Sequence, residues 1–240
     1  MHSQNSIELN PIFNIKTKRE KQRCQAMIYL RKRYYGIAKR MPPILKRNLD
    51  IAIAGSALLA LSPLLLATIT LIKLESPGAA FFSQIRVGKN GKTFTMWKFR
   101  SMYVDAEARK AELERDNEMS GGVLFKMKND PRITRIGRFI RKFSIDELPQ
   151  IWNVLCGDMS IVGPRPAIPN EVEQYSLQDR QRLRLKPGIT CIWQVSGRSD
   201  IPFKQQVELD RRYISQTSLM TDITLILKTI PAVITAKGSY

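Results

Sequence analysis

The longest hydrophobic run of the chain covers residues 51–72 and contains no charged residue. As a helix this run would be about 33 Å long at about 1.5 Å per residue, enough to cross a bilayer core of about 30 Å. Ser62 and Pro63 lie near its middle, where the proline removes one backbone donor and the serine hydroxyl can satisfy a freed carbonyl. The pattern predicts a membrane helix and leaves two forms open: a spanning helix with a kink, or a re-entrant helix.

The charges on both sides of this run favour the re-entrant form. Residues 1–50 contain 12 Lys and Arg against 3 Asp and Glu, and residues 73–100 contain 6 against 1. Because cytoplasmic flanks of membrane helices carry an excess of Lys and Arg, both ends are expected in the cytoplasm. We therefore predict a basic N-terminal arm over residues 1–45, a re-entrant helix hairpin over 46–75 and a cytoplasmic domain over 76–240. The arm is either a membrane-surface segment or a solvated extension without a role.

A β-hairpin is predicted directly after the membrane helix. Between Ala80 and Arg100, two apolar runs flank Asn90 and Gly91, a pair that suits the left-handed backbone angles of a tight turn. Alternation along the second run places Lys98 and Arg100 on one face of the hairpin.

A short helix with two contrasting faces is predicted after Asp130 and Pro131, which are typical of a helix start. One face is apolar, with Ile133, Ile136, Ile140 and Phe143, and the other carries Arg132, Arg135, Arg138, Arg141 and Lys142. The helix either packs on the core with a solvated face or lies at a membrane interface and presents phosphate ligands. Five cations without an acid favour the second interpretation.

Three more helices are predicted in the C-terminal third, over residues 171–185, 204–214 and 219–230. The last has an apolar stripe, for which core packing is the default expectation, and Pro231 should end it. Together the patterns predict an α+β fold that is mostly helical, with one hairpin, amphipathic helices and an N-terminal membrane helix.

Composition narrows the partners without choosing among them. The net charge of +18 favours an anionic partner, which could be nucleic acid, a membrane surface or a phosphorylated substrate. Three cysteines without CxxC spacing indicate neither a disulfide framework nor a zinc site. The single histidine is His2, so acid–base chemistry in the body of the chain would fall to carboxylates, Lys or Arg.

The adjacent carboxylates of Asp146 and Glu147 are the strongest chemical signal, because a Gly163-Pro164-Arg165-Pro166 turn follows them. An Asp carboxylate can attack phosphorus and form an acyl phosphate, and Mg²⁺ typically binds one or two carboxylates together with substrate phosphates. The bland alternative is a capping box, in which Ser144 and Glu147 merely cap a helix. Pro149 argues against it, since a regular helix from Ser144 would need its missing amide. Spacing alone leaves the two interpretations about equal.

Five motifs follow one another along residues 43–240: KRNLD at 46–50, KFRSM at 98–102, SIDELPQ at 144–150, GDMSIVGPRP at 157–166, and PGIT with QVSGR between 187 and 198. In these motifs and their order the chain resembles the bacterial sugar transferases, monotopic phosphoglycosyl transferases that move a sugar phosphate from a nucleotide sugar onto a polyprenyl phosphate. The C-terminal segment is most similar to members that start exopolysaccharides of the succinoglycan type. Where the family usually has PGITG, this chain has Cys191 in place of the last glycine.

The resemblance implies a role for each motif. Asp146 would be the nucleophile and Glu147 the Mg²⁺ ligand. Phosphate contacts are expected from Arg141, Arg165, Arg198, Lys98 and Arg100. Ser62 and Pro63 match the family's helix-breaking dipeptide. Lys46, Arg47 and Asp50 are expected at the mouth of the helix hairpin, where the two cations can meet lipid phosphates and Asp50 can pair with them or cap the helix.

The implied enzyme is an undecaprenyl-phosphate hexose-1-phosphate transferase of the inner membrane with its catalytic domain facing the cytoplasm. Its expected partners are a UDP-hexose, with UDP-galactose and UDP-glucose as leading donors, undecaprenyl phosphate and anionic membrane lipids. No nucleic acid is expected, and homo-oligomer formation is left open. The rival hypothesis is a basic adaptor without catalytic activity that binds membranes or nucleic acid, since +18 would suit it equally.

Overall fold

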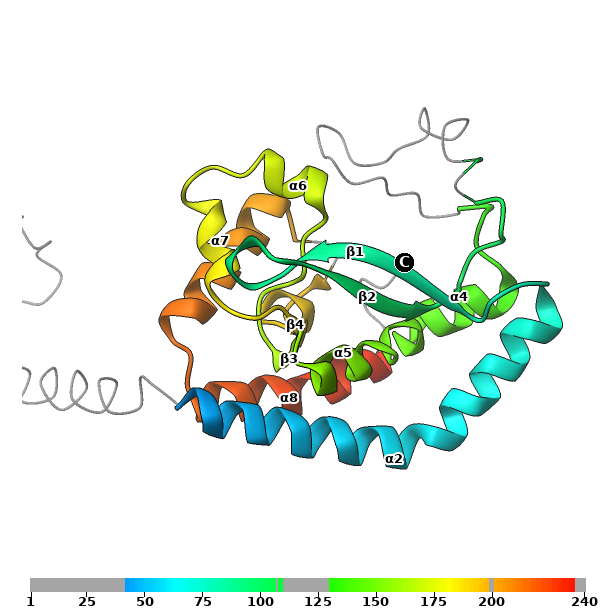
Figure 1. The fold of residues 1–240 in the computed structure, drawn as a ribbon, viewed down its shortest axis with the longest axis horizontal. Helices are drawn as coiled ribbons and strands as arrows, with labels where there is room; N and C mark the ends of the chain where they lie inside the picture. Colours follow the sequence, from blue (N-terminus) through cyan, green and yellow to red (C-terminus); the bar gives the residue numbers. More distant parts are fainter. Residues whose placement is uncertain (1–41, 107, 110–129, 199–200, 236–240) are drawn as a thin grey trace, which may run out of the picture. The chain divides into compact units, whose positions relative to one another are not determined.

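The structure is a computed structural model that describes residues 42–106, 108–109, 130–198 and 201–235. The predicted basic arm therefore lies outside the described residues except for its last four. The described part is mostly helical, with one antiparallel and one parallel pair of short strands (Figure 1). This confirms the predicted class.

A long apolar helix, α2 (Pro43–Glu75), begins the described chain. Asp50, Ala54, Thr68 and Ile72 are buried and share the side of the helix that faces the domain, while most other α2 residues are exposed. It is the one helix among the described residues that is long and apolar enough to cross a membrane. An exposed apolar surface of this length needs a nonaqueous environment, which the membrane can supply.

The Ser62–Pro63 pair lies inside α2, and the helix continues through it. Figure 1 shows α2 bending near its middle. The Ser62 hydroxyl donates to the carbonyl of Leu59 at 2.8 Å, which is the acceptor that Pro63 leaves without its helical donor. Thr68 and Thr70 also donate to carbonyls four residues earlier, a pattern that often bends helices. The helix thus bends with its freed carbonyl satisfied, and the re-entrant course through a membrane stays a prediction.

The predicted hairpin is confirmed as β1 (Phe81–Val87) and β2 (Thr93–Phe99), paired antiparallel. Asn90 and Gly91, in the short turn η1 (Lys89–Gly91), have φ of 57° and 80°, the left-handed angles that the pair was expected to adopt.

The segment after the hairpin differs from the predicted helix. Helix α4 (Arg135–Lys142) begins after Thr134, whose hydroxyl accepts from the amide of Gly137 at 2.8 Å. The prediction of a start at Asp130 is wrong because the segment before Thr134 pairs with the chain that follows β2: Ile133 forms an isolated β-bridge with Met102, and the amide of Thr134 donates to the carbonyl of Ser101. A single 3-10 turn, η3 (Ile145–Glu147), and helix α5 (Gln150–Cys156) follow.

Two glycines bring distant motifs together at the parallel pair of β3 (Ser160–Val162) and β4 (Gly188–Thr190). A Cβ on Gly188 would lie 2.0 Å from the amide nitrogen of Gly163, so neither position has room for a side chain. Because the strands are parallel, the residues that follow them lie at the same edge. Arg165 after β3 and the QVSGR segment after β4 are thereby placed in one region.

The C-terminal third contains α6 (Pro169–Glu173), η4 (Asp179–Arg184), η5 (Trp193–Val195), α7 (Phe203–Ser215) and α8 (Leu219–Thr235). The predicted helix over 171–185 is wrong, since α6 and η4 are separate short elements there, whereas the helix predicted over 204–214 is confirmed as α7.

Helix α8 departs from its prediction in two ways. It continues through Pro231, and its apolar stripe is mostly exposed, with Ile226 alone among the predicted stripe residues packed against a buried cluster. The exposed positions repeat every three or four residues: Met220, Ile223, Leu227, Ile230 and Ile234. Leu225 faces the core instead. A second exposed apolar surface therefore accompanies that of α2, as expected for an interfacial helix.

Candidate active site

A pocket of about 710 Å³ collects residues from α2, β2, η3, α8 and the segments that follow β3 and β4. Six of the residues predicted to act on substrate line it: Asp146, Glu147, Lys98, Arg141, Arg165 and Arg198. They come from positions up to 100 residues apart in the sequence. The structure thus combines two carboxylates and four cations in one concave site.

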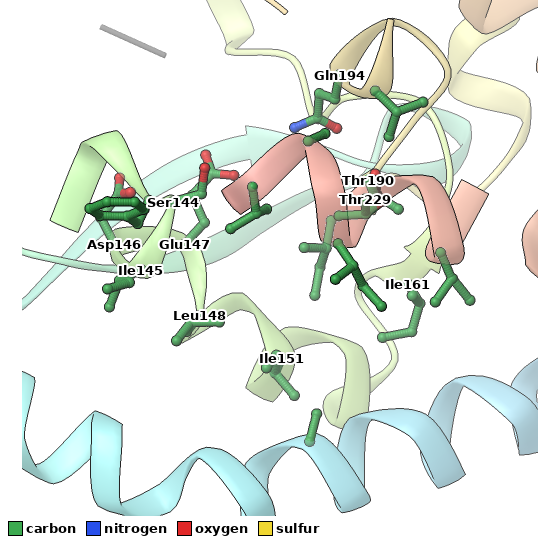
Figure 2. A pocket seen from close by; sticks show the side chains of 18 of the residues that line it. Ser144, Ile145, Asp146, Glu147, Leu148, Ile151, Ile161, Thr190, Gln194 and Thr229 are labelled. Atoms are coloured by element: carbon green, nitrogen blue, oxygen red, sulfur yellow. Dashed lines mark hydrogen bonds between the residues drawn. The ribbon is translucent and has the colours of Figure 1, made fainter. Parts of the chain in front are cut away.

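The acid pair lies on a strained turn rather than in a helix cap. Ser144 has a φ of 55° and makes no side-chain capping hydrogen bond, which excludes the capping-box alternative. Pro149 follows η3, and α5 begins only at Gln150. Strained backbone is often found at functional sites, and here it aims neighbouring acids at the pocket (Figure 2).

Lys98 lies between the two carboxylates but is nearer to one of them. Its Nζ is 2.7 Å from Oε1 of Glu147 and 3.9 Å from Oδ2 of Asp146. Burial raises the pKa of Asp146 to about 6; Lys98 and Arg141 oppose this shift, whereas the negative charge of Glu147 adds to it. Burial also disfavours charge on Glu147, but Lys98, Arg165 and Arg86 together oppose it, so the pKa of Glu147 lies below its usual value. At neutral pH, Asp146 is therefore mostly ionised yet poorly solvated, a state that suits a nucleophile.

The position of Lys98 depends on a residue that sequence reasoning missed. The buried Asn153 of α5 accepts from the amide of Trp97 at 3.0 Å and donates to the carbonyl of Thr95 at 2.7 Å. These bonds join α5, which directly follows the acids, to β2, which carries Lys98. A lone Asn in an apolar helix gives no hint of this role in the sequence.

Arg165 contacts a buried polar network through Glu171. Its Nη1 lies 3.4 Å from Oε2 of Glu171, and the other oxygen of Glu171 accepts from the hydroxyl of Tyr175 at 2.9 Å. Arg182 lies 3.7 Å from Glu171 and 2.6 Å from Asp210. We did not predict these residues, since their spacing resembles that of ordinary surface charges.

Three residues that line the pocket each have a buried polar atom without a hydrogen-bond partner within the described residues: Nη1 of Arg198, Nε1 of Trp193 and Oε1 of Gln194. Burial lowers the pKa of Arg198, against the opposing effect of Glu147, and its φ of 52° is strained. Buried polar atoms usually find partners, so a polar ligand is the natural candidate. Only Arg198 was predicted, although the quoted QVSGR motif includes Gln194.

Arg100 does not reach this pocket. Its guanidinium donates to the carbonyls of Ser76 at 2.7 Å and Pro77 at 2.8 Å, where α2 ends. Alternation predicted that Lys98 and Arg100 share a face and a phosphate site, but Lys98 lines the pocket whereas Arg100, just after β2, contacts the end of α2.

The residues predicted to meet lipid phosphates bond within the protein instead. Lys46 pairs with Asp222 of α8 at 2.6 Å. Arg47 donates to the carbonyls of Val154 and Leu155 at the end of α5, and buried Asp50 accepts from Ser160 and Ile161. The KRNLD motif therefore fastens α2 to α8, α5 and β3.

The donors present fit Mg²⁺ only together with a substrate. The described residues contain no group of three or more His, Cys, Asp and Glu side chains that could hold a metal alone. Asp146 and Glu147 offer two carboxylates in the pocket, with side chains 12% and 29% exposed. Two carboxylates completed by phosphate oxygens and water match the usual Mg²⁺ site in phosphoryl-transfer enzymes.

Cys191, which departs from the family pattern, is accommodated without strain. Its side chain is buried, and the left-handed non-glycine residues among those described are Asn90, Ser144 and Arg198. The position therefore does not need glycine.

Comparisons with known proteins show the family of this chain. The bacterial sugar transferase family model matches residues 41–236. Galactosyl transferase CpsE of Streptococcus agalactiae is 49% identical over 82% of this chain and 43% of its own length. Exopolysaccharide production protein ExoY of Sinorhizobium fredii is 40% identical over 85% of this chain and 92% of its own length. Undecaprenyl-phosphate galactose phosphotransferase of Salmonella typhimurium is 42% identical over 85% and 43%, respectively, so the chain spans less than half of two of these three relatives.

Proposed function

This chain belongs to the bacterial sugar transferase family, and we propose that it transfers hexose 1-phosphate from a UDP-sugar to undecaprenyl phosphate and releases UMP. The observation that carries the proposal is the pocket in which Asp146 and Glu147 face four cations. The printed names of the relatives support galactose as the first sugar to test and exopolysaccharide synthesis as the setting. UDP-glucose is the second donor to test.

In the first half of the reaction, an oxygen of Asp146 attacks the phosphorus that bears the sugar. The bond between this phosphorus and the bridging oxygen breaks, UMP leaves with the electron pair, and the phosphosugar remains on Asp146 as an acyl phosphate. Lys98, Arg141, Arg165 and Arg198 would stabilise the negative charge that builds up on the phosphate oxygens. The guanidinium groups of the three arginines also match phosphate oxygens in geometry.

In the second half, a phosphate oxygen of the lipid attacks the same phosphorus. The bond to Asp146 breaks, its carboxylate is restored, and the sugar is left on a lipid diphosphate. Glu147 is the proposed protein ligand of Mg²⁺, which when bound would neutralise phosphate charge in both halves. Two steps at one phosphorus allow a water-soluble donor to leave before a lipid acceptor reacts.

We extend the proposal to the membrane course of α2. Its bend near the middle, the part of the helix that contains Pro63, and the basic flanks support a re-entrant helix of the inner membrane, with both ends and the catalytic domain in the cytoplasm. Cysteines introduced near positions 45 and 78, on an otherwise cysteine-free chain, should be labelled only from the cytoplasmic side. Labelling of either from the periplasm would overturn this topology.

The function is tested with purified protein, Mg²⁺, undecaprenyl phosphate and a panel of UDP-sugars, following UMP release. We expect turnover with one or a few donors. Absence of UMP release from every donor, together with salt-sensitive binding to DNA, would favour the basic adaptor instead.

A further inference from the structure

The pocket changes its chemical character with distance from α2. Figure 2 shows the carboxylates of Asp146 and Glu147 on the side away from α2, and the aliphatic side chains of Leu148, Ile151 and Ile161 on the side toward it. α2 itself adds more aliphatic lining: Ala57, Leu61 and Leu64. One end is thus polar and charged, and the other is a hydrocarbon-lined groove.

Helix α8 supplies another apolar part of the pocket wall. Ile226, Ala232 and Val233 line the pocket from α8. Leu64 of α2 and Ile230 of α8 both line the pocket and are exposed at the surface of the protein. The aliphatic end therefore reaches the exposed apolar faces of both helices.

A UDP-sugar does not explain this half of the site. Uridine, diphosphate and hexose all carry polar groups, which the polar end can satisfy with its cations and unpartnered donors and acceptors. An isoprenyl chain, in contrast, has no polar atoms and gains free energy when apolar walls remove it from water. A polyprenyl phosphate has the same sequence of characters as the pocket, a charged head followed by hydrocarbon.

We propose that the groove between α2 and α8 holds the isoprene units next to the phosphate of the lipid acceptor. The phosphate would lie toward Asp146, and the remainder of the chain would leave between the two helices toward the bilayer. This inference rests on the proposed function for the identity of the lipid, and it assigns α8 a binding role in addition to interfacial contact.

Filling the groove tests the proposal, because α2 and α8 offer matched positions inside and outside it. Ala57→Phe and Ala232→Phe place a ring in the lining, whereas Ala60→Phe and Leu227→Phe place it at exposed positions of the same helices that do not line the pocket. Two sites are used because Ala57 also packs against a buried cluster, so Ala57→Phe alone could disturb folding.

Two measurements separate the halves of the reaction. Without a lipid, each protein molecule should release one UMP as the phosphosugar is trapped on Asp146. With undecaprenyl phosphate added, steady-state turnover gives KM for the lipid. We expect both lining variants to keep the single UMP release and to raise KM for the lipid about tenfold or more, the scale of overfilling a packed site. Both exposed variants should stay within about twofold of wild type.

If both lining variants lost the single UMP release as strongly as they lost turnover with the lipid, the proposal would be overturned, since the groove would then serve the donor. Equal KM changes in the exposed variants would also overturn it, because they would report membrane partition alone.

A diazirine placed in the first isoprene units of undecaprenyl phosphate gives a readout that does not need turnover. Crosslinks to α2 and α8 that undecaprenyl phosphate competes away support the groove, and crosslinks confined to other segments overturn it. Wild-type protein that releases no UMP would refute the proposed function, while the crosslinks still decide the lipid site.

Discussion

Asp146 and Asp210 are alike in acidity and opposite in access. Burial raises the pKa of each carboxyl to about 6, and a nearby cation opposes the shift in both. The side chain of Asp146 is 12% exposed and lines the pocket, whereas that of Asp210 is fully buried and does not. A perturbed pKa alone would therefore nominate both as catalytic, and only access to the pocket distinguishes them.

Their cations differ in the same way. Lys98 is 3.9 Å from Asp146 and forms its closer ion pair with Glu147, so no cation binds Asp146 tightly and its carboxylate can react. Arg182 is 2.6 Å from Asp210 and is itself almost fully buried, so that pair is committed to structure. Asp146, Glu147 and Lys98 can therefore take part in chemistry, whereas Glu171, Arg182 and Asp210, the structural cluster, can position Arg165.

The largest expected effect comes from removing the charge of each Asp in turn. Asp146→Asn should lower UMP release by at least about 10³-fold, because an amide cannot act as the nucleophile, while unfolding stays near wild type. Asp210→Asn should retain activity in the molecules that stay folded but lower stability. UMP release and thermal unfolding of both variants in detergent check this contrast. Near wild-type activity in Asp146→Asn would refute the covalent mechanism.

The next effect tests the structural cluster through its cation. Arg182→Met leaves Glu171 and Asp210 buried without their shared partner and should cost about 3–5 kcal/mol of unfolding free energy at pH 7.5. The cost should shrink by pH 5, because the pKa of Asp210 is raised to about 6 in the folded protein. Below this pH the carboxyl is mostly protonated and needs no cation, whereas above it the folded protein must hold a buried charge that Arg182 offsets. Denaturant unfolding at both pH values measures it. A cost independent of pH would mean that packing rather than charge is responsible.

The contrast also shows what the sequence could predict. Asp146, Glu147, Lys98, Arg165 and Arg198 were predicted as site residues because short motifs contain them, and Arg141 because it lies just before the SIDELPQ motif. The hairpin followed from Asn90 and Gly91. The supporting acids Glu171 and Asp210 could not be identified, because no local pattern distinguishes a buried carboxylate from an exposed one. Their role arises only when α6, η4 and α7 meet.

Two helices show the same limit. For α2, length and the absence of charge were sufficient to predict a membrane-length helix. For α8, the apolar stripe was correct but its surroundings were not, since periodicity shows which residues share a face and not what covers that face. Arg100 was misplaced for a related reason: alternation gives the face of a strand, while tertiary packing decides what lies opposite.

A smaller effect is expected where the structural cluster touches the pocket. Glu171→Gln keeps an acceptor for Tyr175 but removes the charge that faces Arg165 at 3.4 Å. We expect a loss of about tenfold in kcat/KM for the UDP-sugar, within the usual range for partners that orient a site residue. Glu173→Gln, two residues away on the same helix and exposed, is the matched control and should change little. Equal losses in both variants would exclude a specific link to Arg165.

The smallest expected effect is a shift in pH dependence, and it tests whether Lys98 tunes the pocket acid. The proposed nucleophile must be ionised, and kcat/KM reports the free protein, so activity should fall as the pH drops through about 6. Lys98 lowers the pKa of Asp146 against the effect of burial. Lys98→Met should therefore move the acid limb to higher pH, in addition to any loss of phosphate binding. Lys92→Met, an exposed change on the same hairpin, should leave the limb in place. If the acid limb of the kcat/KM profile stayed near pH 6 in Lys98→Met, the group that titrates there would not be Asp146. The raised pKa of Asp146, like that of Asp210, would then have no effect on catalysis.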